Sequence, residues 1–430
     1  MWRNKGKTTG ARTPLPSEAP TTSRTPTPAR AQAVDSDPEP VDSLQKHYNN
    51  LCLEKSQEVN PFLLHILQGV DEEIRKGLKA ITLNIAGNNH SVPVERVTGE
   101  HFWILSKLIE KNPCINASIH LCSSGLDIRY NLISDVGAYY AARLLQKKHS
   151  LLYLNLMFND IGPKGGELLA KALHMNTTLK YLRMTGNKVE NEGGMFFAAM
   201  LQINSSLEKL DLGDCDLEES TVHLGQMLKE NHWLVELYMS KHDVRNPGLK
   251  QLCDGLNLNK SLRYLDISCN KITRDGISSL ADVLKNNTTL EVIDLSFNRI
   301  ENVGAVKLSE TLASHNRSLK ALSVVSNSIE GEGLVALSES MKTNTTLSNI
   351  YIWGNKFDEA TCVAYSDLIQ MGRLKPDNTD VEPYVVDGHM YLAEVSNGLK
   401  KHYYWTPTYG EACSPSSNAG FSIVPVSEQL

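Results

Sequence analysis

The sequence of 430 residues contains no apolar run near the 18 or more residues that a membrane-spanning helix needs, so we expect no membrane insertion. Its net charge of −6 is small and no domain is strongly basic, so we expect no direct binding of nucleic acid. Its eight cysteines form no C-x-x-C pair, so neither a zinc site nor a disulfide framework is expected. The pattern of a signal peptide is missing too, which predicts a protein that is not secreted and keeps its thiols reduced.

Motifs of catalysis are missing as well. Neither G-x-S-x-G nor H-E-x-x-H occurs, and the glycines of 162–166 lack the G-x-x-x-x-G-K-[ST] spacing of a phosphate loop. We therefore expect no enzyme activity, no cofactor and no metal site.

What the sequence does have is one phrase, L-x-x-L-x-L-x-x-N-x-I-x-x-x-G, which is most complete at 262–276. It recurs about every 28 residues, within the range of 20–29 for leucine-rich repeats. The first leucines of the copies are Leu151, Leu179, Leu207, Leu234, Leu262, Leu290, Leu319 and Leu347. The asparagine position holds Asn159, Asn187, Cys215, His242, Asn270, Asn298, Asn327 and Asn355.

Each position of the phrase has a physical reason. The apolar residues Leu262, Leu265 and Ile267 are spaced as a short strand whose inward side chains share one face. The amide of Asn270 can bond backbone groups that the following turn leaves unpaired, and Gly276 is expected to permit a tight entry into a helix. Each repeat is expected to form one coil of a stacked solenoid. Strands of adjacent coils lie about 4.8 Å apart and packed helices about 10 Å, so the stack must curve. We therefore predict an α/β leucine-rich-repeat solenoid, a horseshoe with a parallel concave sheet and outer helices.

A second series of asparagines follows the helices. Its members are Asn176, Asn204, Asn231, Asn259, Asn287, Asn316 and Asn344. Asparagine tolerates the left-handed conformation that ends many helices, so we interpret the series as helix caps. Most members also read as N-x-[ST] glycosylation motifs, but capping already explains their spacing.

These residues resemble the ribonuclease-inhibitor-like class of leucine-rich-repeat proteins over about 78–361. The stretches LDLGDCDL (210–217), IDLSFNRIENVG (293–304) and YIWGNKFDEAT (351–361) are similar to one group of vertebrate members. That resemblance implies a non-enzymatic protein of germ and stem cells, resident in nucleus or nucleolus as well as cytoplasm. Inhibition of ribonuclease is not expected, because inhibitors of this class are very rich in cysteine and strongly acidic.

The chain divides into five segments by composition. Residues 1–42 and 411–430 are expected to be disordered tails. Residues 43–77 predict a helical cap over the first coil, with a partner-binding helix pair as the alternative. The repeats fill 78–362, and 363–410 predict a C-terminal cap.

Two places depart from the repeat. The coil of Cys215 lacks the glycine and is one residue short, which suggests a junction where a repeat has been lost. After the repeats, Asp387-Gly388 predicts the turn of a hairpin, and Lys400–Trp405 is more basic and aromatic than a plain tail requires.

The concave face is the candidate binding surface, because alternate strand residues point onto it. Aromatic residues and arginine are enriched at binding hot spots. We predict partner contacts at Tyr153, Asn155, Tyr181, Arg183, Asp211, Glu236, Tyr238, Tyr264, Asp266, Asp294, Tyr351 and Trp353. Within this set, Asp211, Glu236, Asp266 and Asp294 are expected to form an exposed acidic stripe that favours a basic partner. The alternative is that Leu-Asp-Leu is simply a common phrase of such repeats.

These observations favour a protein-interaction scaffold that is a monomer on its own and resides in cytoplasm and nucleus. Two alternatives stay open. One is a regulator of a small GTPase, because activators of the nuclear-transport GTPase use similar repeats, although with a long acidic tail that is absent here. The other is a fixed structural subunit of a ciliary or nucleolar assembly, which would use its convex helices too.

Overall fold

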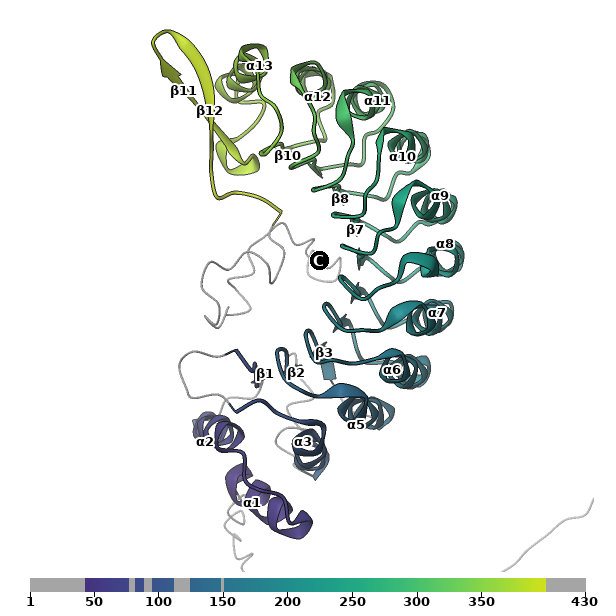
Figure 1. Ribbon diagram of the computed structural model, residues 1–430, viewed down its shortest axis with the longest axis vertical. Coiled ribbons are helices and arrows are strands. Elements are labelled where there is room, and N and C mark those ends of the chain that lie inside the picture. Colours follow the sequence, from purple (N-terminus) through teal and green to yellow (C-terminus); the bar gives the residue numbers. More distant parts are fainter. Residues whose placement is uncertain (1–42, 77–81, 89–94, 112–123, 148–150, 400–430) are drawn as a thin grey trace, which may run out of the picture. The chain divides into compact units, whose positions relative to one another are not determined.

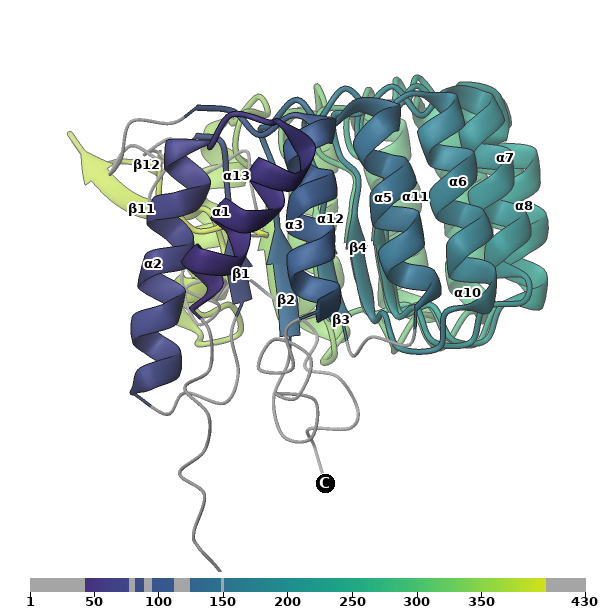
Figure 2. The same ribbon diagram turned by 90° about the horizontal axis from the view of Figure 1, so that it is seen from below.

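The computed structural model describes residues 43–76, 82–88, 95–111, 124–147 and 151–399, which belong to one compact unit. The two predicted disordered tails lie outside the described residues, as do the last residues of the predicted C-terminal cap. Within the unit, strands line the inner side of an arc and helices its outer side (Figure 1). Figure 2 shows the outer helices standing side by side.

The described strands of the repeats form one ten-stranded sheet in chain order, and every neighbouring pair is parallel. They are β1 (Thr82–Asn84), β2 (Ser124–Asp127), β3 (Leu151–Asn155), β4 (Tyr181–Arg183), β5 (Lys209–Asp211), β6 (Glu236–Tyr238), β7 (Tyr264–Asp266), β8 (Val292–Asp294), β9 (Ala321–Ser323) and β10 (Asn349–Tyr351). The predicted α/β solenoid is therefore confirmed.

One helix follows each of these strands. The helices are α3 (Gly99–Lys111), α5 (Ser134–Gln146), α6 (Pro163–Met175), α7 (Glu190–Leu201), α8 (Thr221–Glu230), α9 (Arg245–Leu256), α10 (Arg274–Asn286), α11 (Glu301–Ser314), α12 (Gly331–Thr343) and α13 (Glu359–Gln370). Between the layers, the inward leucines pack into a continuous core, and Leu265 is fully buried in it. Because each coil covers its neighbour, the core runs through the whole stack.

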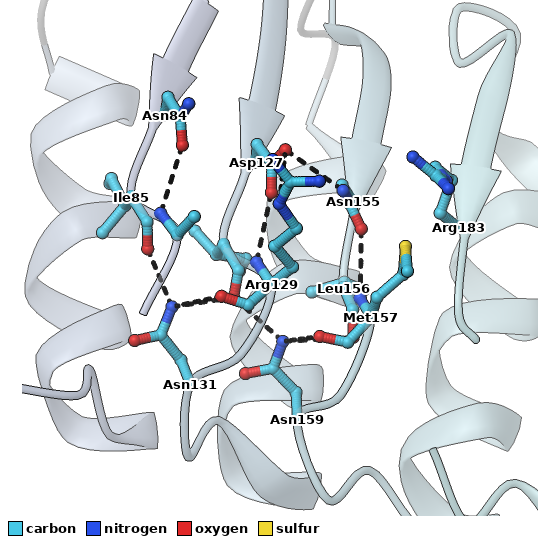
Figure 3. A network of polar contacts seen from close by, with 12 residues as sticks. Asn84, Ile85, Asp127, Arg129, Asn131, Asn155, Leu156, Met157, Asn159 and Arg183 are labelled. Carbon is cyan, nitrogen blue, oxygen red and sulfur yellow. Dashed lines mark hydrogen bonds and ion pairs between the residues drawn. The ribbon is translucent and has the colours of Figure 1, made fainter. Parts of the chain in front are cut away.

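The asparagines of the phrase link one coil to the next (Figure 3). Nδ2 of Asn159 donates to the carbonyl of Ile128 in the preceding coil (2.9 Å) and to that of Leu156 in its own coil (3.1 Å). The amide oxygen of Asn187 accepts from the backbone N–H groups of Asn159 (3.1 Å) and Ile161 (3.0 Å). One buried side chain thus satisfies backbone groups of two coils, which extends the role that the sequence predicts.

The left-handed backbone occurs beside this asparagine ladder and not at the helix-capping asparagines. Cys269 and Lys271, which flank Asn270, both have φ of 55°. By contrast, Asn176 is extended, with φ −79° and ψ 132°. It caps by its side chain, since Nδ2 donates to the carbonyl of Leu145 at the end of the preceding helix (2.9 Å). The predicted capping role holds, but the predicted left-handed conformation of this series is wrong.

The glycine of the phrase is required by packing rather than by helix entry. Gly276 lies inside α10 with ordinary helical backbone, and an added Cβ would stand 2.5 Å from Oδ1 of Asn246 in the preceding coil. Gly304 would place a Cβ 2.7 Å from the side chain of Ile300. The absence of a side chain therefore lets each helix lie close to its own turn and to its neighbour.

Two helices, α1 (Leu44–Lys55) and α2 (Pro61–Arg75), precede the first coil. The carboxylate of Asp71 accepts from the backbone N–H groups of Leu44 (2.8 Å) and Gln45 (3.1 Å) and so caps α1. Buried side chains of both helices, such as Phe62, extend the apolar core. They occupy the place of the predicted N-terminal cap.

At the other end, two side chains replace the groups that a further coil would supply. Arg373 donates from Nε to the carbonyl of Met341 at the end of α12 (2.7 Å), as a helix-capping asparagine would. The carboxylate of Asp380 accepts from the backbone N–H groups of Ile352 (2.8 Å) and Trp353 (2.9 Å). Burial raises the pKa of Asp380 to about 6.

A hairpin of β11 (Val381–Val386) and β12 (His389–Glu394) follows Asp380. Its turn is the predicted Asp387-Gly388 pair, with φ of 49° and 85°. Both angles are positive, as a two-residue hairpin turn of this type requires.

Candidate functional site

The sheet register places the concave side chains in two rows that run across the coils. The first row pairs, in order, Tyr153, Tyr181, Lys209, Glu236, Tyr264, Val292, Ala321 and Asn349. The second row pairs Asp127, Asn155, Arg183, Asp211, Tyr238, Asp266, Asp294, Ser323 and Tyr351. Trp353 lies two residues beyond Tyr351. Eleven of the twelve predicted contact residues therefore lie in these two rows, whereas Trp353 packs against the main apolar core.

The N-terminal half of this face, on β2–β5, contains paired charges beside tyrosines. Nε of Arg183 lies 3.5 Å from Oδ2 of Asp211, and both side chains are buried. The rings of Tyr153 and Tyr181 have centroids 5.2 Å apart, and Nζ of Lys209 lies 5.9 Å from the centroid of Tyr181. Both tyrosines keep part of their surface exposed. This half can stack and hydrogen-bond a partner at once.

The C-terminal half, on β6–β10, is more apolar. Tyr238, Tyr264, Val292, Ala321 and Tyr351 form one buried cluster across it. The rings of Tyr238 and Tyr264 are 4.9 Å apart. Trp353 packs at the far end, with its ring edge-on to Phe357 at 5.7 Å.

The predicted acidic stripe is not a single row, and this expectation is corrected. Asp211, Asp266 and Asp294 share the second row, but Tyr238 interrupts them between the first two. Glu236 lies in the first row, where its carboxylate is 2.8 Å from Nζ of Lys209. The acids also lie in different settings, because Glu236 and Asp211 each face a cation.

The aspartates of the second row accept hydrogen bonds from backbone N–H groups of their own coil, a role that the sequence did not predict. Oδ1 of Asp266 accepts from the backbone N–H of Ser268 (2.9 Å), and Oδ1 of Asp294 accepts from that of Ser296 (2.9 Å). Asn155 bonds the N–H of Met157 in the same way (3.1 Å). A short side-chain acceptor at this position therefore closes the end of the strand. This explains why Leu-Asp-Leu recurs, and it weakens the reading of these acids as binding residues.

Several predicted contact residues are more buried than expected. Asp266 has no exposed surface, and Tyr238 is 6% exposed. The hydroxyl of Tyr238 donates to Oε2 of Glu236 (2.7 Å), and burial raises the pKa of this tyrosine well above its usual range. Close-packed neighbouring coils leave little room between large concave side chains. Changing Tyr238 or Asp266 therefore disturbs packing as well as any contact with a partner.

Sequence reasoning missed two contributors to this face. Arg129 follows β2, and its Nε lies 3.5 Å from Oδ2 of Asp127 (Figure 3). Leu399, after the hairpin, joins the apolar cluster of the C-terminal half. Arg129 could have been found as the outward residue of an incomplete repeat. Leu399 had no signal, because no repeat position predicts where the chain runs after β12.

Other kinds of site find no support in the described part of the chain. No group of three or more potential metal ligands occurs among those residues. The cysteines that the structure describes are free thiols, and burial raises the pKa of Cys215 and Cys253. None of the described helices is long and apolar enough to cross a membrane.

Known proteins match the chain as follows. The leucine-rich-repeat family profile matches residues 147–170, 176–198, 258–281, 286–309 and 315–338. Leucine-rich repeat-containing protein 34 of Homo sapiens is 69% identical over 423 residues, covering 91% of this chain and 89% of that protein. The protein of the same name from Mus musculus is 67% identical and is covered completely, again with 91% of this chain. The resemblance to a vertebrate group is thereby confirmed. Among solved structures, actin-binding site 2 of leiomodin-1 is 20% identical over 34% of this chain and 85% of that chain, with a TM-score of 0.31.

Proposed function

Because this chain belongs to the leucine-rich-repeat family of leucine-rich repeat-containing protein 34, we propose that it is a non-enzymatic scaffold that binds protein partners on its concave face. One observation carries the proposal. The register brings partly buried tyrosines, a buried arginine–aspartate pair and a lysine–glutamate pair together on β3–β6. A surface meant only for solvent needs polarity but not aromatic rings beside prearranged charges.

The N-terminal half is the better candidate for the centre of the contact. Tyr153 and Tyr181 offer large rigid rings at little cost in side-chain entropy. Arg183 is held by Asp211, and Lys209 by Glu236, so the cations are positioned before a partner arrives. A partner segment that combines an apolar side chain with hydrogen-bonding groups fits this surface.

The test is affinity purification from cells with the tagged full chain, followed by mass spectrometry. The double variant Tyr153→Ala with Tyr181→Ala removes both rings while leaving the charge pairs in place. Truncation of hot-spot residues costs about 2 kcal/mol or more, so specific partners should be depleted roughly 30-fold. The circular dichroism melting curve checks that the variant remains folded.

A matched control exists on the convex side. Tyr139 and Tyr140 of α5 also have ring centroids 5.2 Å apart, and Tyr139 is exposed. Tyr139→Ala with Tyr140→Ala should leave the partner set unchanged. If the concave and convex variants lose the same partners, or neither loses any, the concave face is not the binding site.

A second candidate function, a fixed subunit of a larger assembly, is favoured by one further observation. Met175, Ile203 and Leu258 each directly precede a capping asparagine, so they lie along the same edge of the coils, and Trp233 belongs to the coil between. All four are more than half exposed. Met175→Ser with Ile203→Ser would then remove partners that survive the concave change, and unchanged recovery would count against this candidate.

The place of action is a further part of the proposal. We propose that the protein is a monomer on its own and works in germ or stem cells, in the cytoplasm and the nucleus or nucleolus. The support is the resemblance of the family and nothing in the geometry. Imaging of the tagged full chain in such cells tests it, and exclusion from the nucleus would contradict it.

A further inference from the structure

The chain turns back onto the concave face after its last strand. Beyond β12, the backbone N–H of Val395 donates to the carbonyl of Asp380 (3.0 Å), and Nδ2 of Asn397 donates to that of Pro376 (3.1 Å). Leu399 then joins the apolar cluster of the C-terminal half and is only 8% exposed. Figure 1 shows this segment leaving β12 toward the inner side of the arc. The described part of the chain therefore ends at the concave face.

The sequence that follows suits this place. Lys400 to Trp405 reads Lys-Lys-His-Tyr-Tyr-Trp, two lysines, a histidine and then three large aromatic residues. Six extended residues span about 20 Å, and four strand spacings of about 4.8 Å cover a similar distance. The segment is thus long enough to pass from β10 to β6.

The concave face of β6–β10 has a negative charge that is complementary to the two lysines of this segment. At the two rows of β6–β10, the described strand positions hold three acids, Glu236, Asp266 and Asp294, and no lysine or arginine. Glu236 is paired with Lys209 of β5, so the attraction comes mainly from Asp266 and Asp294. The rows of β2–β5 hold Arg183 and Lys209 as well as acids. A basic segment is therefore attracted to the C-terminal half and opposed by the cations of the N-terminal half. The aromatic rings can continue the cluster that Leu399 begins.

We propose that residues 400–405 bind the concave face of β6–β10 in their own chain, so that this half is occupied until a partner displaces the segment. Leu399 is the anchor, the lysines are attracted by the negative charge of Asp266 and Asp294, and the rings lie over the tyrosine cluster. A tether of a few residues gives an effective concentration in roughly the millimolar range, which a partner must overcome. The proposal rests on the proposed function, since it makes the concave face a partner site that its own chain regulates.

The experiment uses full-length chains and a fluorescent synthetic peptide of residues 396–410. The tail variant carries Tyr403→Ser, Tyr404→Ser and Trp405→Ser. Fluorescence anisotropy should show the peptide binding the tail variant at least about 10-fold more tightly than the wild type, because the tethered segment of the wild type competes. A peptide with Lys400→Glu and Lys401→Glu should bind the tail variant at least about 10-fold more weakly, because its charge is reversed.

Two variants control the site. Tyr384→Ser with Tyr391→Ser removes the stacked, exposed pair of the hairpin, 5.6 Å apart, and should leave peptide binding as weak as in the wild type. Adding Ala321→Arg to the tail variant places a cation inside the cluster and should abolish binding. A melting curve shows whether the Ala321→Arg chain is folded. If it is not, Ser323→Arg on the same strand replaces it.

Three results would overturn the proposal. Equal binding by wild type and tail variant means that the segment does not occupy the face, and binding by neither means that the face does not accept it. A wild-type dimer in light scattering that dissociates in the tail variant places the segment on a second copy. None of these touches the proposed function, which falls if Tyr153→Ala with Tyr181→Ala retains every partner or loses only the partners that the convex variant also loses.

Discussion

The two halves of the concave face share one backbone and differ in what they present. On β2–β5, Arg183 and Lys209 are each paired with an acid of the next strand, beside partly buried tyrosines. On β6–β10, an apolar cluster is combined with acids and contacted by Leu399. The difference lies entirely at positions that the repeat leaves free. The repeat therefore supplies a scaffold, and we propose that the free positions adapt one half to partners and the other half to the chain's own C-terminal segment.

Both halves share the asparagine ladder, and removing one of its side chains should have the largest effect on the free energy of unfolding. Asn298 accepts from the backbone N–H groups of Asn270 and Ile272 and donates to the carbonyls of Ile267 and Leu295. Asn298→Ala leaves several buried groups without partners and should lower the free energy of unfolding by about 4–6 kcal/mol, measured by urea denaturation.

The matched change lies where the halves meet. Cys215 takes the same position with two weak S–H contacts, to the carbonyls of Met184 (3.3 Å) and Gly213 (3.4 Å). Cys215→Ala should therefore cost only about 1 kcal/mol. Equal costs for the two variants would show that hydrogen bonding is not what the ladder contributes.

In the coil after that of Cys215, His242 takes the asparagine position, and it should make the stability of the fold depend on pH. Nδ1 of His242 accepts from the N–H of Leu217 (3.2 Å), and the ring is almost completely buried. Burial lowers the pKa of His242 to about 4. The unfolded chain binds this proton more readily than the folded chain. The contribution of neutral His242 to the free energy of unfolding is therefore fully present above pH 6.5 and is lost as the pH decreases to 4, by roughly 3–4 kcal/mol.

The variant His242→Asn tests this, because asparagine is the usual residue of the ladder and does not titrate. Urea unfolding at pH 7, 5.5 and 4.5 should show a smaller loss of stability on acidification in the variant than in the wild type. The same pH dependence in both chains would mean that His242 is not the group that titrates.

The end of the C-terminal half should respond to pH in the opposite direction. Burial raises the pKa of Asp380 to about 6, so the folded chain binds this proton more tightly than the unfolded chain. The corresponding stability is present below pH 3.8 and is lost as the pH rises through 6, by roughly 2–3 kcal/mol.

In the wild type, protonation of Asp380 on acidification offsets part of the destabilisation that other groups cause. The variant Asp380→Asn lacks this offset, so lowering the pH from 7 to 4 should reduce its free energy of unfolding more than that of the wild type. Urea unfolding measures it, with the exposed residue Asp377 changed to Asn as control. A smaller acid sensitivity in Asp380→Asn would contradict the assigned pKa direction.

The sequence predicted what periodic spacing determines. Leu262, Leu265 and Ile267 gave strand, core and curvature, because a solenoid has few ways to bury them. It did not predict that Asp266 is buried or that Gly276 is needed for packing. Both depend on contacts between neighbouring coils, which a single copy of the phrase does not display. The path of Leu399 onto the concave face was beyond prediction, since no periodicity governs the chain after β12.

The central claim, that the concave face binds the partner, is tested most directly by hydrogen exchange of the full chain with and without a purified partner. The account predicts slower exchange of backbone amides in β3–β5 and in the turns that follow these strands, with α5–α7 unchanged. Slower exchange confined to the outer helices, with the strands unaffected, would contradict it.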